Sequence, residues 1–512
     1  MAQYMPPYAL SDFTGGLNVK DEPYAIADNQ LAELENAVIN RGSISKRSGY
    51  ATSYIHPVSG NHFTDLYQFF FDDVFSISLS VGSDHTLYRS GNGGMVPVPF
   101  FGITGLETDS VQMLGYKDVL LEPICLLADQ GTLKLFDKAR DNVKKVLAYT
   151  PTPEEQQNIG LNDLGNLTNF RTMALNKDRL FAAAHLEVGN RLSFCQRNAK
   201  TGLAMYDYWP ATYFIDIPSD GDDTIVKLEL FRGDLVIFCK RTIWVLEGDG
   251  TTVSDYRLKR INVPAGCMSA RSVTIVDNSI FYLGGDSKVY ELFSTEQEYV
   301  SAREVSQNVS DLISSTPYAY KYKAPAIYFE NKYILSFSDG TTVVFDTLLR
   351  IWLKWTNIPA ISFLVAFNDL SFSHQNGRVY EFKPKTYNDD GVAIPFLMRT
   401  KNLDFGFPVQ RKKLKRLWTV AKQYQAESST YNIRLFVDSF EISSKDVSTD
   451  VSGVWDEGDW DEVQWDFKDV VKSTHRFKTK GEYVQVEVSN NKLDEPFTLF
   501  QIVFYFKLKK PK

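Results

Sequence analysis

The chain has 512 residues, a formal net charge of −8 and 44% hydrophobic residues. Its length exceeds the size at which one hydrophobic core stops growing, so we expect more than one domain. The acidic balance disfavours a free-standing nucleic-acid-binding protein, because such proteins are usually basic. The four cysteines follow no disulfide or zinc spacing, the start shows no secretory signal, and no apolar run matches the length of a membrane span.

Residues 1–50 are expected to form a short N-terminal arm with one helix. Asp28 is a suitable N-cap, and Leu31, Leu34 and Val38 follow it at helical spacing. Turns are expected at Gly15-Gly16 and around Gly42.

Residues 51–385 repeat a strand–turn–strand pattern seven times. Successive repeats lie 36 to 59 residues apart, which is close to the roughly 40–50-residue period of a β-propeller with one blade per repeat. The aromatic content of 14% also favours an all-β fold. We therefore predict a propeller of about seven blades. The second strand of each pair opens on a branched aliphatic residue, at Leu87, Leu133, Leu192, Ile243, Val289, Val343 and Val379.

The last repeat is short, so the seventh blade needs a strand from elsewhere. A strand within 43–55 is the candidate, because propellers commonly close by pairing strands from the two ends of the chain. If that strand pairs elsewhere, the ring has six full blades and a remnant.

The turn-rich segment 383–395 predicts a domain boundary. From 396 to 512 the sequence is again typical of strands. In YVQVEVS, Val484, Val486 and Val488 alternate with Gln485 and Glu487, as in a half-buried strand. We therefore predict a C-terminal β-sandwich over 396–512.

The sequence shows no catalytic constellation. Its six histidines have no motif partner, and it contains no phosphate-binding glycine loop, zinc-protease helix or nucleophile elbow. A propeller enzyme acting on polysaccharide would need paired carboxylates at one mouth, and no pair can be nominated. We therefore predict a protein that is not an enzyme and binds no cofactor.

The segment 454–466, VWDEGDWDEVQWD, has the most unusual composition. Its clustered carboxylates are of the kind that bind calcium, but their spacing misses the EF-hand pattern. We favour an exposed loop whose tryptophans pack on the sandwich or on a neighbouring subunit. The carboxylates in question are Asp456, Asp459, Asp461 and Glu462.

The segment 410–418, QRKKLKRLW, is strongly basic. Its cations are candidates for contact with DNA phosphates or with an acidic partner. The favoured alternative is a solvated strand face, in which Leu414 points inward and Lys413 and Lys415 point to the other side. The candidate contact residues are Arg411, Lys412, Lys413, Lys415 and Arg416.

Both ends of the chain resemble the β-propeller tail proteins of short-tailed phages, the nozzle or hub below the portal and adaptor. In these proteins an F-x-G-G-x-N stretch precedes D-N-Q and N-A, and G-x-I-x-K-R-x-G-Y follows. In TKNLDFGFPVQRKKLKRLW (400–418), an F-G-x-P turn precedes a lysine-rich strand, as in the same family. The matching N-terminal positions are Phe13, Gly15, Gly16, Asn18, Asp28, Asn29, Gln30, Asn36, Ala37, Gly42, Lys46, Arg47, Gly49 and Tyr50.

This resemblance implies a structural virion protein that assembles in the host cytoplasm. It implies a ring, typically of six copies, that extends the DNA channel, helps to hold packaged DNA and docks fibres or spikes. It transfers no catalytic residues. The alternative is a glycan-binding propeller for receptor recognition, which should carry repeated pockets on its blades.

Overall fold

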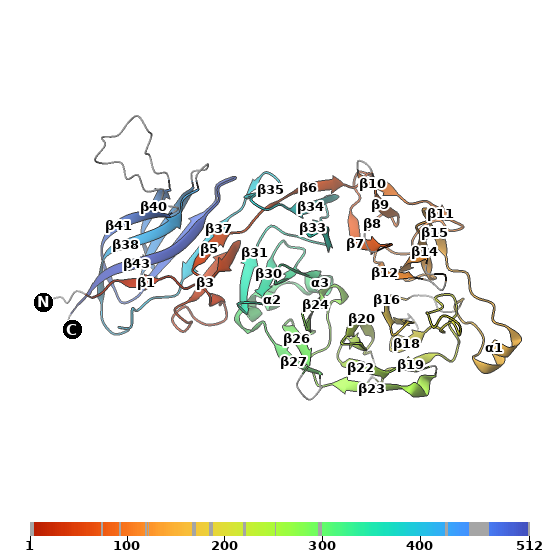
Figure 1. Ribbon diagram of the computed structural model, residues 1–512. Helices are drawn as coiled ribbons and strands as arrows, with labels where there is room; N and C mark the ends of the chain where they lie inside the picture. The colour runs from red at the N-terminus through yellow and green to blue at the C-terminus, as the bar shows by residue number, and fades with distance from the viewer. Residues whose placement is uncertain are drawn as a thin grey trace.

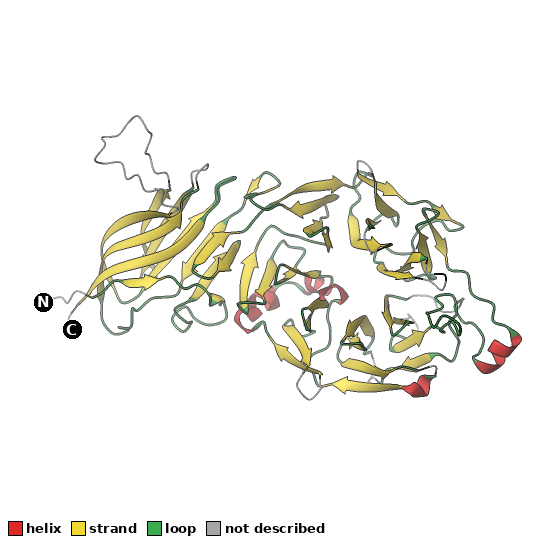
Figure 2. Ribbon diagram, in the orientation of Figure 1, coloured by secondary structure: helices red, strands yellow, loops and turns green. Residues whose placement is uncertain are grey.

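The computed structural model describes residues 5–509, apart from 73–74, 92–93, 118–119, 121, 166–169, 184–187, 219–221, 251, 295–299, 425–428 and 450–469. Strands dominate it, as predicted for an all-β fold (Figure 2). Seven small sheets, each with four antiparallel main strands, form a ring, and a two-sheet sandwich lies beside it (Figure 1).

The first four blades are built from consecutive strands. Blade 1 contains β7 (Phe63–Phe70), β8 (Ser76–Gly82), β9 (Leu87–Gly91) and β10 (Gly94–Pro97). Blade 2 contains β12 (Gln112–Lys117), β13 (Pro123–Ala128), β14 (Lys134–Asp137) and β15 (Asn142–Lys145), with β11 (Phe100–Phe101) parallel to β15. Blade 3 contains β16 (Thr172–Asn176), β17 (Arg179–Ala183), β18 (Arg191–Phe194) and β19 (Phe214–Asp216). Blade 4 contains β20 (Ile225–Phe231), β21 (Asp234–Cys239), β22 (Ile243–Gly248) and β23 (Tyr256–Ile261).

The last three blades lie nearest the sandwich in Figure 1. Blade 5 contains β24 (Thr274–Val276), β25 (Ser279–Leu283), β26 (Val289–Ser294) and β27 (Val300–Glu304). Blade 6 contains β28 (Ala326–Phe329), β29 (Lys332–Ser336), β30 (Thr342–Asp346) and β31 (Ile351–Trp355). Blade 7 contains β32 (Ser362–Ala366), β33 (Asp369–Ser373), β34 (Arg378–Phe382) and β6 (Tyr50–Ile55), and β35 (Asn388–Asp389) and β36 (Val392–Ala393) extend it.

The repeated pair found in the sequence is the middle hairpin of each blade. Its second strand is the third strand of the sheet, for example β9 in blade 1 and β34 in blade 7. Leu133 lies immediately before β14, and the other six anchors lie within their strands.

Blade 7 is completed by a strand from the N-terminal part of the chain. β6 pairs antiparallel with β34, so Tyr50 lies opposite Phe382. The Tyr50 ring packs against Phe372 and Tyr380, with ring centroids 5.0 and 4.9 Å apart. The closing strand is therefore 50–55, whereas Ser43–Lys46 (β5) belongs to the sandwich.

One arginine links several blades across the hub, the space ringed by the first strands of the blades. Arg271 lies in a short 3-10 helix, Ala270–Ser272, just before blade 5. Its guanidinium pairs with Asp65 of blade 1 at 2.7 Å and donates to the carbonyl of Ile361 before blade 7. Asp65 also accepts from the backbone of Val111, which precedes blade 2. Four blades are thus tied together through the hub.

The sandwich takes strands from both ends of the chain. One sheet has the order β4 (Ala37–Asn40), β5, β43 (Thr498–Leu508), β38 (Lys412–Lys422) and β41 (Val470–Gly481), with β1 (Tyr8–Leu10) also paired to β43. The other has the order β2 (Gly16–Leu17), β3 (Gln30–Glu35), β37 (Phe396–Thr400), β42 (Val484–Asn490), β39 (Thr430–Val437) and β40 (Phe440–Ser448).

The predicted helix near residue 30 is wrong, because this segment forms β3 and β4. A bulge lies between Leu31 and Glu33, where the register against β37 shifts by one residue. This extra residue lets Leu31 and Leu34 both reach the core, at a spacing of three that imitates a helix. Asp28 caps no helix; it accepts hydrogen bonds from Tyr8 and Lys401 instead.

The expectation of a separate N-terminal arm is also corrected, because β1 to β5 are strands of the two sandwich sheets. The described α-helices lie elsewhere and are short. They are α1 (Pro153–Asn158), α2 (Ser310–Ser315) and α3 (Tyr318–Tyr322).

A buried histidine makes the sandwich sensitive to acid. His475 of β41 is 3% exposed, and its Nε2 lies 3.4 Å from the hydroxyl of Thr419. Burial, reinforced by Lys445, lowers the pKa of His475 to about 4. Between that pH and the unfolded value of about 6.5, the unfolded chain binds a proton that the folded chain does not. The free energy of unfolding should therefore fall as the pH falls through this window.

Replacing His475 by glutamine should flatten this response. We expect the wild-type chain to lose about 2–3 kcal/mol more than H475Q between about pH 7 and pH 4.5, as measured by urea unfolding. If the free energies of unfolding of the two proteins fell in parallel with pH, the imidazole would take up no proton on unfolding, and its pKa would not be lowered in the folded chain.

Candidate functional site

Several of the N-terminal positions that carry the resemblance converge on a buried joint between the propeller and the sandwich. Its centre is Arg47, whose side chain is 1% exposed. The guanidinium forms a two-pronged ion pair with Asp389, at 2.9 and 2.6 Å, and the Asp389 side chain is fully buried. The same guanidinium donates to the carbonyl of Thr356, at the end of blade 6. Such a pair fixes geometry because the planar guanidinium matches both carboxylate oxygens.

Asn36 completes this joint from the break between β3 and β4. Its backbone has φ +51°, a conformation that asparagine adopts more readily than most residues. The side-chain oxygen accepts from Arg47 Nε at 2.8 Å and from the Thr356 amide at 2.9 Å. The side-chain amide donates to the Thr356 hydroxyl and to the Pro395 carbonyl. All polar atoms of this buried amide are therefore satisfied.

Two motif glycines allow segments to approach closely at the joint. A Cβ at Gly49 would lie 1.8 Å from the carbonyl oxygen of Asn388. Gly16 has φ +65°, and a Cβ there would lie 2.7 Å from the side chain of Ile351. Neither position accommodates a larger residue without movement of the backbone.

The remaining polar motif residues shape the loop that enters the sandwich. The Asn18 amide donates to Asp21 and to Gln30, and its oxygen accepts the backbone amides of Lys20 and Asp21. Asn29 donates to Asp12. Phe13 is buried in the core, whereas Gly15 packs against Asn29 and Gly42 turns β4 into β5. These positions therefore have structural contacts.

Lys46 is a buried cation of the same joint. Its ammonium donates to the side chain of Asn490 at 2.9 Å and to the carbonyls of Lys492 and Glu495. Burial lowers the pKa of Lys46 to about 8. Ala37, on the neighbouring strand, is also fully buried.

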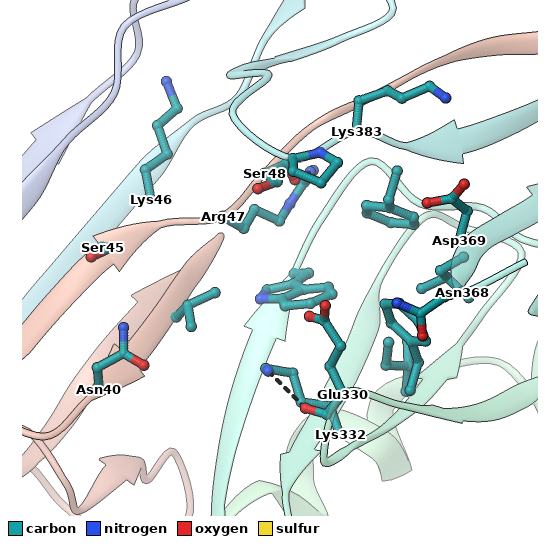
Figure 3. Close-up of a pocket in the computed structure, with 17 residues that line it drawn as sticks. Asn40, Ser45, Lys46, Arg47, Ser48, Glu330, Lys332, Asn368, Asp369 and Lys383 are labelled. Atoms are coloured by element: carbon teal, nitrogen blue, oxygen red, sulfur yellow. Dashed lines mark hydrogen bonds between the residues drawn. The ribbon is translucent and has the colours of Figure 1, made fainter.

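A cleft of about 420 Å³ opens beside this joint. Figure 3 shows Arg47 at one side of the cleft, with Glu330 and Lys332 of blade 6 and Asp369 of blade 7 at the other sides, whereas the ammonium of Lys46 points away from them. Both motif cations already have partners inside the protein, and Lys332 donates to the Glu330 carbonyl. The cleft is thus lined by charges of both signs, and its motif residues, Lys46 and Arg47, are engaged in contacts within the protein.

The basic segment predicted from the sequence forms β38 in the middle of a sandwich sheet. Leu414 points inward, as predicted. Lys412 also points inward, where it is 1% exposed and donates to the carbonyls of Phe407 and Glu482. Lys412 therefore does not belong to the outer face. Lys413, Lys415 and Arg416 are on the solvent side, and Arg411 is exposed just before the strand.

The outer face of this sheet has one sign of charge. Apart from the inward-facing Lys412, its strands β38, β41 and β43 carry nine lysines and arginines, four, four and one respectively, and no aspartate or glutamate. Lys413 lies directly opposite Lys480 on one side and Lys507 on the other. Arg416 lies opposite Arg476 and Tyr505 in the same way.

Five lysines form a compact group, here called the lysine cluster: Lys413, Lys415, Lys480, Lys507 and Lys509. Repulsion from Lys415, the largest effect, and from the other three lowers the pKa of Lys413. The carboxylates Asp404, Glu482 and Asp438 act instead on Lys412, on the opposite side of the strand. The cluster lies where β43 ends, at the end of the sandwich away from the propeller (Figure 1).

Lys413 and Lys415 are among the candidate contacts predicted from the sequence, but no local pattern places Lys480, Lys507 and Lys509 beside them. These three come from β41, from β43 and from just after β43, far along the chain. Strict alternation in KSTHRFKTK (472–480) places Lys472, Arg476, Lys478 and Lys480 on one face of a strand, and this signal was available.

Calcium binding by Asp456, Asp459, Asp461 and Glu462 stays a prediction, because these residues lie outside those described. Within the described ranges, no group of three or more histidine, cysteine or acidic side chains is placed to hold a metal ion. The four cysteines are buried and unpaired with one another. No helix in the described part of the chain has the length and apolar character needed to cross a membrane.

Comparisons with known proteins identify similar folds only. No family model and no curated protein matches the sequence. Solved structures that match include BamB from Moraxella catarrhalis (12% identity, 75% of this chain and 98% of that chain, TM-score 0.37) and the Neurospora crassa Pan2 WD40 domain (10%, 67% and 96%, TM-score 0.35). The computationally designed Ika8 protein matches at 11% identity over 65% of this chain and 99% of its own, with a TM-score of 0.38. At these identities and scores, the matches carry no information about function.

Proposed function

We propose that this chain is a structural protein of a phage tail, the nozzle or hub of a short-tailed phage. In this role several copies, six by the family resemblance, form a ring that extends the DNA channel below the portal and adaptor. The ring also docks other tail components, such as fibres or spikes, and performs no catalysis.

The observation that carries the proposal is the joint around Arg47. The motif positions shared with phage tail proteins supply its central cation, the amide of Asn36 and the close approach at Gly49. A part that transmits load between two domains needs a fixed joint, and a buried, hydrogen-bonded ion pair supplies fixed geometry.

A second observation supports contact with neighbouring subunits. β40 is the last strand of its sheet, so one of its edges has no partner among the described strands. Phe440 and Ile442 on this strand are 74% and 49% exposed. Exposed apolar residues on a free sheet edge favour pairing with another chain.

Particles purified from the source of this sequence provide the direct test. We expect peptides of this chain in the particles, in an amount that matches one ring per tail, and a ring of density at the tail in cryo-electron microscopy. A chain that is absent from particles and monomeric at micromolar concentration would overturn the proposal. Binding on a glycan array, in that case, would favour the receptor-recognition alternative.

A further inference from the structure

We propose that the lysine cluster binds the phosphate backbone of double-stranded DNA without sequence preference. The cluster joins side chains from three strands, at Lys413, Lys480 and Lys507 in register, with Lys415 and Lys509 beside them. Ammonium groups are point charges that hold phosphates and release the counterions of DNA. This inference goes beyond the proposed function and does not depend on it.

The spacing of the cluster suits a row of phosphates. Neighbouring strands lie about 5 Å apart, and alternate residues on one strand lie about 7 Å apart. The cluster therefore covers about 10 Å across the strands. Duplex DNA carries one charge per about 1.7 Å of its axis, so several phosphates fall within that length.

The composition of the face argues against a protein as the partner. Lysine is depleted in the cores of protein–protein interfaces, which use aromatic and other apolar anchors. None of the large apolar side chains that are exposed in the described residues lies on β38, β41 or β43. The four charges with the largest effect on Lys413 in the described chain are all lysines, so this face favours a partner with closely spaced anions.

Duplex rather than single-stranded DNA fits the aromatic residues of this face. Proteins that bind single strands offer exposed rings on which bases stack. Here Trp418 and Tyr505 pack on each other with ring centroids 4.8 Å apart, and the indole Nε1 is enclosed. This face therefore offers contacts to the phosphate backbone of DNA rather than rings on which bases stack.

The test is fluorescence anisotropy of the full chain with a labelled DNA duplex at several salt concentrations. The variant K413Q/K480Q/K507Q removes three charges from the cluster. The control K145Q/K200Q/K240Q removes three exposed lysines from the propeller, so both variants have the same net charge. A third variant, K413R/K480R/K507R, keeps the charge and shows whether the fold tolerates substitution at these positions.

We expect the cluster variant to lose at least about tenfold in affinity, and its plot of log K against log salt to be shallower by about 2–3. The control and the arginine variant should bind as the wild type does. Equal losses in the cluster and control variants would overturn the proposal, because net charge alone would then explain them. Displacement of DNA by polyglutamate at equal charge concentration would also overturn it, in favour of an acidic protein.

Discussion

Replacing Arg47 by methionine is expected to lower the free energy of unfolding by about 3–5 kcal/mol. The change leaves the carboxylate of Asp389 buried with Asn357 as its remaining side-chain donor, at 3.1 Å. It also removes the donor that reaches Asn36 and the Thr356 carbonyl. Denaturant unfolding followed by tryptophan fluorescence measures the loss.

Two further variants show whether burial of the ion pair causes this effect. Arg140 pairs with Asp137 on the surface and is 70% exposed, so R140M should cost less than about 1 kcal/mol. The double variant R47M/D389L should recover part of the loss, because no charge stays buried without a partner. An R47M protein as stable as R140M would contradict the importance of the joint.

Removing residues 1–55 is expected to abolish the folded state. The deletion takes the outer strand of blade 7 and all of β1 to β5 from the two sandwich sheets. It exposes the apolar residues that these strands cover and leaves strand edges unpaired in both parts of the molecule. Soluble yield and circular dichroism of the truncated chain measure the effect, with a chain lacking only residues 1–4 as the control.

The same topology predicts that a cut between β6 and β7 is tolerated. The connection 56–62 contains exposed Val58, and Gly60 has open space around it, so a protease site can be inserted there. After cleavage, the two fragments should co-elute in size-exclusion chromatography and separate only in denaturant. A folded truncation, or fragments that separate in native buffer, would show that the N-terminal strands contribute little.

The blades could be predicted from sequence because their hairpins are local. Each apolar run and its turn lie within about 20 residues, and two of the turns are Asp339-Gly340 and Asn376-Gly377. The sandwich could be predicted only in part. Its strands β1, β3 and β5 pair with segments more than 350 residues away, and no local pattern specifies such partners.

The candidate sites could likewise be predicted where the pattern is local, but not where contacts between distant segments decide the outcome. The alternation around Leu414 correctly placed Lys413 outside, yet it gave no sign that Lys412 meets backbone carbonyls in the interior. Arg47 was found through its motif, but its partner Asp389 lies in a turn-rich segment that reads as a linker. Burial and partner choice depend on packing between distant segments, which spacing along the chain does not encode.

The link between Arg271 and Asp65 also bears on how an assembly of this chain could enclose a passage. Because this ion pair joins blades 5 and 1 across the hub, it obstructs a passage along the propeller axis at that level. In the proposed ring the bore must therefore lie between subunits, with each copy contributing one arc of its wall. The width of that bore is then set by the number of copies and by the angle at which they meet, independently of the number of blades.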